Sequence, residues 1–196
     1  MIDYLTHYYL KGTPPFRSLS TLPDDEALRL MTALCDETPF GVRFKDPLQY
    51  LHHRRQTEQW VRAEFIAKGG QPQEPYPIYM ALGSSPWLVK AAPDTLRHGE
   101  IRIPLSILQE GDVSFTYPDS MVSHWLGNDQ PAEYYQPEYH GIVFTRSEIL
   151  AIIAERGLPE EGWEPRLPDH LPPYIEAQVW NRERLLVYQE QMWASA

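Results

Sequence analysis

The sequence predicts an α+β fold, in which a mostly antiparallel sheet has two to four helices packed on it. Helical patterns dominate the first third of the chain and strand patterns the middle, an order that favours α+β over an alternating, doubly wound sheet. The length of 196 residues suits one domain that is large enough to bury its own core. No shift in composition and no internal repeat marks a boundary, so we expect a single globular domain over residues 1–196.

The first third of the chain predicts one strand followed by two helices. Residues 2–10 are rich in Tyr and Leu and indicate a strand, which ends where Gly and Pro gather in 12–15. Pro23 suits the first turn of a helix, and three acidic residues follow it. Residues 47–68 predict a long helix that ends at Gly69-Gly70. The expected buried stripe of the first helix is Ala27, Leu28, Met31, Leu34 and Cys35.

The middle of the chain predicts three strands. Residues 78–82 are apolar and close at a Gly-Ser-Ser-Pro turn, and residues 100–105 alternate apolar and polar side chains. Pro104 has no N–H to donate to a ladder, so we expect that strand at the edge of the sheet or ending early. Residues 113–117 alternate again, and residues 118–120 predict a turn.

The last third predicts a loop, a short strand, a helix and a final strand. Polar and aromatic residues fill 127–141, and 142–144 indicates a short strand. Capping-box spacing at the start of 145–157 predicts a helix there. Residues 174–180 alternate strongly and indicate a strand, while 181–196 is compatible with either a helix or a returning strand.

Charge and cysteine content disfavour several classes of protein. The net charge of -10 disfavours a broad nucleic-acid face and attachment to anionic lipid, because both require clustered Lys and Arg. One cysteine, Cys35, cannot form an intramolecular disulfide, and this suits a reducing compartment. The sequence shows no signal peptide pattern and no apolar run long enough for a membrane span. We expect a cytoplasmic protein whose partner is a small molecule or another protein.

The sharp sequence motifs of common enzyme classes are absent. The chain contains no GxxxxGK[ST], GxGxxG, HExxH, CxxC or GxSxG pattern, which disfavours nucleoside triphosphatases, dinucleotide folds, zincins and α/β-hydrolases. Its seven histidines lack the short helical spacings of metal ligands, so we predict no metal site.

Two local clusters have alternative interpretations. His52, His53, Arg54 and Arg55 form the one dense basic cluster, which is either a solvated helix face or a small anion site. Ser, Asp and His gather in 114–124, but a catalytic triad needs groups that converge from separate elements. We expect Asp119 and Ser120 to bond the backbone of their own turn.

A third set of residues suggests a cleft formed by three strands. The candidates are His7 and Tyr9 in the early strand, Thr116 and Tyr117 in the middle strand, and Glu176 and Gln178 in the late strand. This order resembles the ADP-ribosyltransferase superfamily, in which an early His or Arg strand, a middle Ser/Thr or Tyr strand and a late Glu strand meet around NAD.

The resemblance implies roles for individual residues. His7 corresponds to the first motif and would hold a ribose, and Thr116 or Tyr117 corresponds to the second. Glu176 corresponds to the third motif, where a carboxylate bonds the nicotinamide ribose and stabilises an oxocarbenium-like transition state. His7 and Glu176 would then be the catalytic residues, and NAD is the candidate cofactor. The alternative is that Glu176 and Gln178 form the solvent face of a half-buried strand.

A second resemblance concerns two longer runs. VSFTYPDSM at 113–121 and YIEAQVW at 174–180 resemble segments of a family of small bacterial cytosolic proteins to which no activity is assigned. This resemblance implies no mechanism.

The sequence thus supports functional hypotheses of different classes. The first is a cleft-containing protein that binds or acts on a nucleotide-like small molecule, with NAD as the candidate. The alternative is a non-catalytic interaction or immunity-like protein that binds a protein partner through its aromatic residues. A carbohydrate binder would use a stacking surface made of Trp125, Tyr134, Tyr135 and Tyr139.

Overall fold

One five-stranded antiparallel sheet organises the molecule. The computed structural model describes residues 2–10, 12–36, 38, 40–91, 98–159, 163, 167–168 and 171–189. The strand order is β3-β1-β2-β5-β4, and every neighbouring pair is antiparallel. The strands are β1 (Tyr4–Leu10), β2 (Ile78–Leu82), β3 (His98–Pro104), β4 (Val113–Thr116) and β5 (Glu176–Val179). The α+β class and the antiparallel sheet are confirmed.

Five α-helices accompany the sheet in the described part of the chain, so the expected number of two to four is too low. They are α1 (Asp24–Leu34), α2 (Pro47–Ala67), α3 (Pro86–Ala91), α4 (Ser120–Asp129) and α5 (Arg146–Arg156). The short α3 and the helix α4 were not expected from the sequence. Short 3-10 turns are η1 (Leu19–Thr21), η2 (Gly41–Phe44), η3 (Leu105–Ile107), η4 (Glu110–Asp112) and η5 (Arg182–Leu185).

Local signals fix the ends of the two longest expected helices. The side chain of Asp46 accepts the N–H of Gln49 and caps α2, which then ends before Gly69 in a positive-φ conformation. In α5 the Thr145 hydroxyl accepts the N–H of Glu148, whose carboxylate in turn accepts the N–H of Thr145. This is the capping box that the sequence predicts.

The edges of the sheet agree only in part with expectation. β3 lies at one edge, and Pro104 is its last residue, as its missing N–H requires. The short strand expected at 142–144 is wrong, because only Phe144 forms an isolated bridge, to Phe115. The stretch after Asn181 is helical as far as residue 189, and residues 190–196 lie outside the described part.

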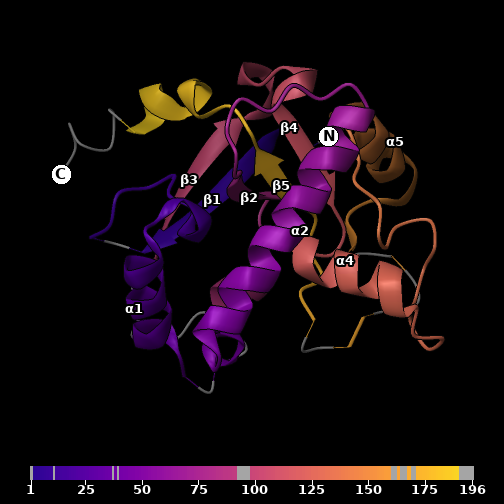
Figure 1. Ribbon diagram of the computed structural model, residues 1–196. Coiled ribbons are helices and arrows are strands. Elements are labelled where there is room, and N and C mark those ends of the chain that lie inside the picture. Colours follow the sequence, from indigo (N-terminus) through magenta and orange to yellow (C-terminus); the bar gives the residue numbers. More distant parts are fainter. Residues whose placement is uncertain are drawn as a thin grey trace.

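The two faces of the sheet have different chemistry, because side chains alternate along each strand. The apolar face carries Leu5, Met80, Phe115 and Ala177, which join the main core together with Ile149 of α5. The other face is covered by α2, which crosses in front of the sheet with α4 beside it (Figure 1).

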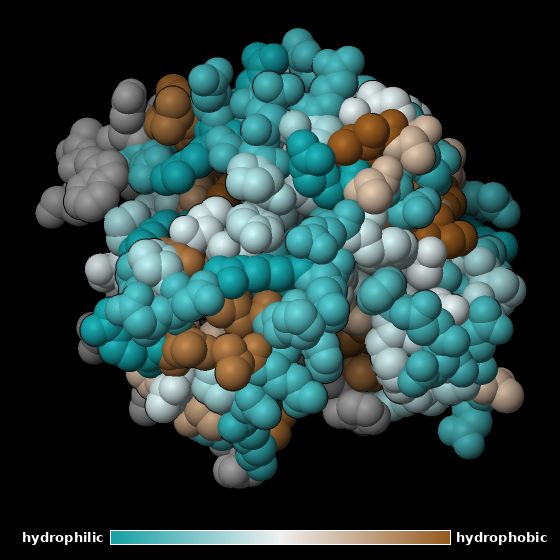
Figure 2. Space-filling model, in the orientation of Figure 1, coloured by the Kyte–Doolittle hydropathy of each residue, from teal (hydrophilic) through white to brown (hydrophobic). Residues whose placement is uncertain are grey.

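The covered face is not solvent-exposed, because α2 supplies a second core there. Val61 and Phe65 of α2 pack with Trp180, directly after β5, and all three side chains are buried. In the same view the surface is largely hydrophilic, and apolar side chains gather between α1 and α2 (Figure 2). No helix in the described residues has the length and apolarity needed to cross a membrane.

Candidate functional site

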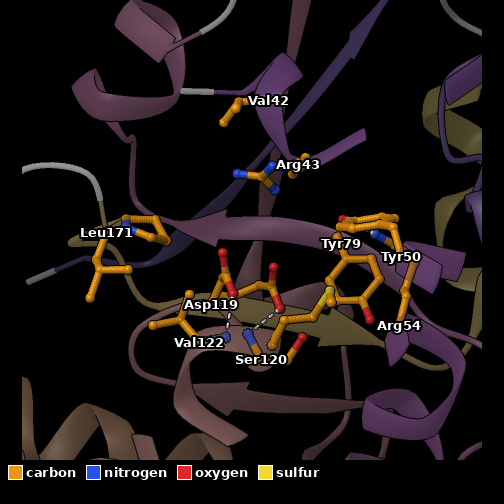
Figure 3. A pocket seen from close by; sticks show the side chains of 12 residues that line it. Val42, Arg43, Tyr50, Arg54, Tyr79, Asp119, Ser120, Val122 and Leu171 are labelled. Carbon is orange, nitrogen blue, oxygen red and sulfur yellow. Dashed lines mark hydrogen bonds between the residues drawn. The ribbon is translucent and has the colours of Figure 1, made fainter. Parts of the chain in front are cut away.

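A polar cleft opens above β2 and β5, on the face of the sheet that α2 and α4 cover. Its volume is about 330 Å³. Arg43 of η2 reaches into it from one side, and Asp119 and Ser120 lie at the opposite side (Figure 3). The polar and aromatic lining consists of Arg43, Tyr50, Arg54, Tyr79, Asp119, Ser120 and Glu176. We call this cavity the cleft.

The register of the sheet places Glu176 in the cleft. Glu176 is directly opposite Thr116 of β4 and Ala81 of β2, and residues that face each other across strands share one face of a sheet. Both neighbours have short side chains, so the carboxylate of Glu176 has space above the sheet. The same register sets Tyr79 and Ser114 on either side of Gln178.

Glu176 is a buried carboxyl with several hydrogen-bond donors. Its side chain is 7% exposed. Its Oε1 accepts the backbone N–H of Ser120 at 2.9 Å and Nε2–H of Gln178 at 3.1 Å. Burial, followed by the charge of Asp119, raises the pKa of Glu176 to about 7 against the opposing effect of these hydrogen bonds. A carboxyl with this pKa can give or take a proton near neutral pH.

The first turn of α4 holds both carboxylates of the cleft. Asp119 is the N-cap of α4, and its Oδ1 accepts the N–H of Val122 at 2.9 Å (Figure 3). The backbone N–H of Ser120, the residue directly after Asp119, donates to Oε1 of Glu176. The positive end of a helix favours negative charge, which explains why two acidic side chains can share this position.

A directed chain of hydrogen bonds runs under Glu176. The indole N–H of Trp180 can only donate, and it donates to Oγ of Ser114 at 2.9 Å. The Ser114 hydroxyl donates in turn to Oε1 of Gln178, also at 2.9 Å. The amide of Gln178 is therefore oriented with its NH₂ group toward Thr116 and Glu176. This chain keeps a donor aimed at the Glu176 carboxylate.

Arg54 is held in place by a buried partner. Its Nε donates to Oε1 of Glu58 at 3.1 Å and to Oγ of Ser20 at 3.2 Å, and its guanidinium lies 4.4 Å from the ring centroid of Tyr79. The hydroxyl of Tyr79 donates to the same Oε1 of Glu58 at 2.9 Å. Burial and the Glu58 charge raise the pKa of Tyr79 well above its ordinary value, so Tyr79 remains a donor.

The basic cluster of α2 divides between surface and cleft. His52 and His53 are exposed, and Arg55 contacts Asp24 at 2.8 Å. Arg54 alone of the four lines the cleft. Three members therefore face outward or bind the first helix, as in a solvated helix face, whereas Arg54 lies at a polar cavity, and anion binding there stays a prediction.

His7 lies beside the cleft in a backbone-bridging position. β1 and β2 are paired at Leu5 and Thr6. At the next residue of β1, the ring of His7 bridges the backbone of β2 and the backbone at Phe16. Its Nδ1–H donates to the carbonyl of Tyr79 at 3.0 Å, and its Nε2 accepts the N–H of Phe16 at 2.9 Å. Burial lowers the pKa of His7 to about 4, so the ring is neutral at neutral pH and both nitrogens are already bonded.

The other residues singled out in the sequence fall into three groups. Thr116 and Gln178 lie next to Glu176: the amide of Gln178 donates both to Oε1 of Glu176 and to Oγ1 of Thr116. Tyr9 and His7 line a second cavity, which shares Arg54 and Tyr79 with the cleft. Tyr117 packs in the main core against Tyr139 and Trp163, away from both cavities.

The Ser/Asp/His cluster of 114–124 forms no catalytic relay. Asp119 bonds the backbone of its own turn, as expected, and Ser123 accepts the N–H of Gly141 at 3.1 Å. His124 stacks on Trp60 of α2 with ring centroids 4.7 Å apart. No group of three or more potential metal ligands gathers in the described part of the chain.

Sequence reasoning missed Arg43, Tyr50 and Tyr79 as components of a site. Arg54 was within reach, since a small anion site was one of the two interpretations of the basic cluster on α2. Arg43 is a single arginine in a 3-10 turn, and Tyr79 lies in an apolar strand, so neither carries a local signal. Comparison with family models, curated proteins and solved structures finds no match to the chain.

Proposed function

We propose that the cleft binds a nucleotide-like small molecule, an anion that also carries sugar hydroxyls, and that NAD is the first candidate. The observation that carries this proposal is the joint presence of two arginines and a buried carboxylate pair around one cavity of about 330 Å³. Cavities of this size with a few converging polar groups are typical of small-molecule sites.

The arginines suit a phosphate or another planar or tetrahedral anion. A guanidinium offers paired N–H donors that match such oxygens in a bidentate manner. Glu58 and Ser20 fix Arg54 before any ligand arrives, which reduces the ordering cost of binding. Arg43 comes from a different element and enters the cleft from above in the view of Figure 3.

Glu176 suits a sugar hydroxyl or a developing positive charge. Its ionised form accepts hydrogen bonds, and a carboxylate beside an oxocarbenium-like centre stabilises the transition state. Its protonated form could act as a general acid at neutral pH, because its pKa is raised to about 7. Glu176 therefore supports a catalytic form of the proposed function, in which the protein cleaves NAD as an ADP-ribosyltransferase does.

The remaining candidates support that chemistry less directly. Gln178 acts through its bond to Glu176, and Thr116 acts through its bond to Gln178. Both ring nitrogens of His7 are occupied, so His7 would contact a ligand through its ring face. Tyr117 lies in the core, and Tyr79 is the tyrosine at the cleft.

Binding is tested by titrating the protein with NAD, ADP-ribose and ribose in a calorimeter and in thermal unfolding. ADP-ribose at ten times its dissociation constant should stabilise the protein by about 1.4 kcal/mol, a rise in Tm of about 3–6 °C. Arg43→Gln should weaken ADP-ribose binding at least tenfold, by roughly 1.4 kcal/mol. The matched control is Arg55→Gln, which removes an arginine that binds Asp24 outside the cleft. Equal loss in both variants, or no response to millimolar NAD and ADP-ribose, contradicts the proposal.

Chemistry is tested separately from binding. The wild-type protein is incubated with NAD, and released nicotinamide is measured. Glu176→Gln keeps the shape and several hydrogen bonds of the side chain, so we expect it to bind ADP-ribose and to lose nicotinamide release. Binding of NAD without release by the wild-type protein would contradict the transferase part and leave a binding protein.

A further inference from the structure

A second cavity of about 260 Å³ adjoins the cleft, and we call it the chamber. Arg54 and Tyr79 line both cavities, so these two side chains form the boundary between them. The chamber lies between the end of β1, the segment before α1, the inner face of α1 and η2. Apolar side chains are visible between α1 and α2 on this side of the molecule (Figure 2).

The chamber has a wall chemistry unlike that of the cleft. Aliphatic side chains of α1 and its approach, among them Leu22, Leu30 and Leu34, line one part of it. Aromatic rings, among them Tyr9 and Phe44, line another. A dry apolar cavity of about 150 Å³ is enough to hold benzene, so the chamber can hold a planar ring system. The lining also contains Arg17 and Arg54, which are paired with Glu26 and Glu58, and the rest of the walls suits apolar, planar groups.

One polar group in the chamber wall has no partner. Ser18 is 3% exposed, and its hydroxyl oxygen is buried without a hydrogen bond among the described residues. Ser18 lines the chamber. Buried hydroxyls are nearly always paired in native proteins, so the unpaired hydroxyl of a residue in the chamber wall is a position where a ligand atom can complete the bond. A heteroatom at the edge of a ring would form the hydrogen bond that the Ser18 hydroxyl lacks.

We infer that the ligand has a planar heteroaromatic ring that lies in the chamber, joined to the anionic part that lies at Arg54 and Arg43 in the cleft. This inference rests on the proposed function, and it adds the ring as a requirement for tight binding. The ring lies among the aromatic and leucine side chains with its polar edge toward Ser18. The anionic part of the ligand lies on the cleft side of the boundary formed by Arg54 and Tyr79.

The test compares ligands that share an anion and a sugar and differ in the ring. Ribose 5-phosphate, AMP and nicotinamide mononucleotide are titrated into the wild-type protein by calorimetry. At least one of the two nucleotides should bind ten or more times more tightly than ribose 5-phosphate. If all three bind with equal affinity, the ring inference is overturned while the anion site stands. If none binds at millimolar concentration, the proposed function itself fails.

Variants of α1 locate the ring. Leu30→Trp puts a larger side chain toward the chamber, and it should reduce nucleotide affinity to that of ribose 5-phosphate while ribose 5-phosphate binding stays unchanged. The matched control is Leu28→Trp, since Leu28 also packs on the core of α1 without lining the chamber. Equal effects of both variants, or equal weakening of nucleotide and ribose 5-phosphate by Leu30→Trp, would overturn the placement.

Ser18→Ala gives an independent test with little risk to folding. The free variant should have an unchanged or higher Tm, because it loses a buried hydroxyl that has no partner. It should bind the preferred nucleotide at least threefold more weakly than wild type and bind ribose 5-phosphate equally well. Unchanged nucleotide affinity would exclude Ser18 from the ring site and overturn that part of the inference.

Discussion

At the scale of single residues, environment decides the role of Glu176 and His7. Both are titratable, both are buried, and burial disfavours the charged form of each. For Glu176 this raises the pKa to about 7, and for His7 it lowers the pKa to about 4. At neutral pH, His7 is thus a neutral bridge between backbone groups, whereas Glu176 is near its titration midpoint in a cavity.

The raised pKa of Glu176 predicts a pH-dependent penalty on stability. Between the ordinary value of 4.5 and about 7, the folded carboxyl keeps a proton that the unfolded chain has released, so stability falls as pH rises through this window. Relative to wild type, Glu176→Gln should therefore gain on the order of 1–3 kcal/mol between pH 5 and pH 8. Urea unfolding at several pH values measures this difference.

The comparison between variant and wild type isolates Glu176. His7 loses stability in the opposite direction, as pH falls from 6.5 toward 4, and this contribution is common to both proteins and cancels. Glu155→Gln, at an exposed position of α5, is the control and should leave the profile unchanged. A constant difference between Glu176→Gln and wild type across this pH range would show that Glu176 is not destabilised by ionisation.

Among the helices and strands, α4 is a helix that the sequence did not predict. The N-cap of α4 is Asp119, and an aspartate is equally typical of a turn. In both settings its side chain accepts a backbone N–H, so the sequence does not distinguish them. Its buried positions include Ser120 and Ser123, so the apolar periodicity that identifies α5 is weak here. The helix is stabilised instead by close packing.

α4 packs closely against the segment at Gly141 through Gly127, so a substitution of Gly127 tests this contact. A Cβ at Gly127 would lie 2.5 Å from the Cα of Gly141, a backbone atom that cannot move aside easily. Gly127→Ala should thus destabilise the protein by roughly 1–3 kcal/mol, although alanine favours helix more than glycine does. Thermal unfolding measures the effect.

Asn128→Ala is the matched control, since Asn128 is the next residue of α4 and is exposed. It should be neutral or slightly stabilising. If Gly127→Ala is as stable as Asn128→Ala, the contact between α4 and the segment at Gly141 is looser than the structure shows.

At the scale of the whole molecule, the cleft is assembled from distant parts of the chain. Arg43, Arg54, Tyr79, Asp119 and Glu176 come from η2, α2, β2, the α4 cap and β5. The strand order places β5 between β2 and β4, although β2 and β4 are closer in sequence. The cleft therefore exists only when the sheet and both covering helices are complete.

This arrangement predicts that anion binding is linked to a proton. An anion at Arg43 and Arg54 stabilises the neutral form of nearby Glu176, so binding takes up a proton at pH values above 7. Affinity for ADP-ribose should fall as pH rises from 6 to 8, by on the order of tenfold if the coupling is about 1.4 kcal/mol. Calorimetry in buffers of different ionisation enthalpy measures the proton uptake.

In Glu176→Gln the affinity for ADP-ribose should be independent of pH over the same range. The diphosphate of ADP-ribose keeps its charge between pH 6 and 8, so the ligand does not produce the effect by itself. A pH dependence that persists in the variant would assign the proton to another group and separate Glu176 from the anion site.

The elements that carry strong local patterns could be predicted from the amino-acid sequence. The spans of β2, α2, α5 and β5 follow from apolar periodicity, capping residues and glycines, which act over a few residues. Pro104 predicted that β3 lies at an edge or ends early, and the structure has it at an edge with Pro104 as its last residue. The candidate residues Glu176, Gln178 and Thr116 could be placed on strands, and Arg54 could be suspected of binding an anion.

The strand order, the burial of both sheet faces and the set of residues that line the cleft could be seen only in the folded chain. The alternation of Glu176 and Gln178 is equally compatible with a solvent face, and it is α2 and α4 that exclude water there. Burial and the nearby charge of Asp119 set the pKa of Glu176. Hydrogen bonds to the carbonyl of Tyr79 and the N–H of Phe16 occupy both ring nitrogens of His7. These are contacts between distant parts of the chain, and no local pattern encodes them.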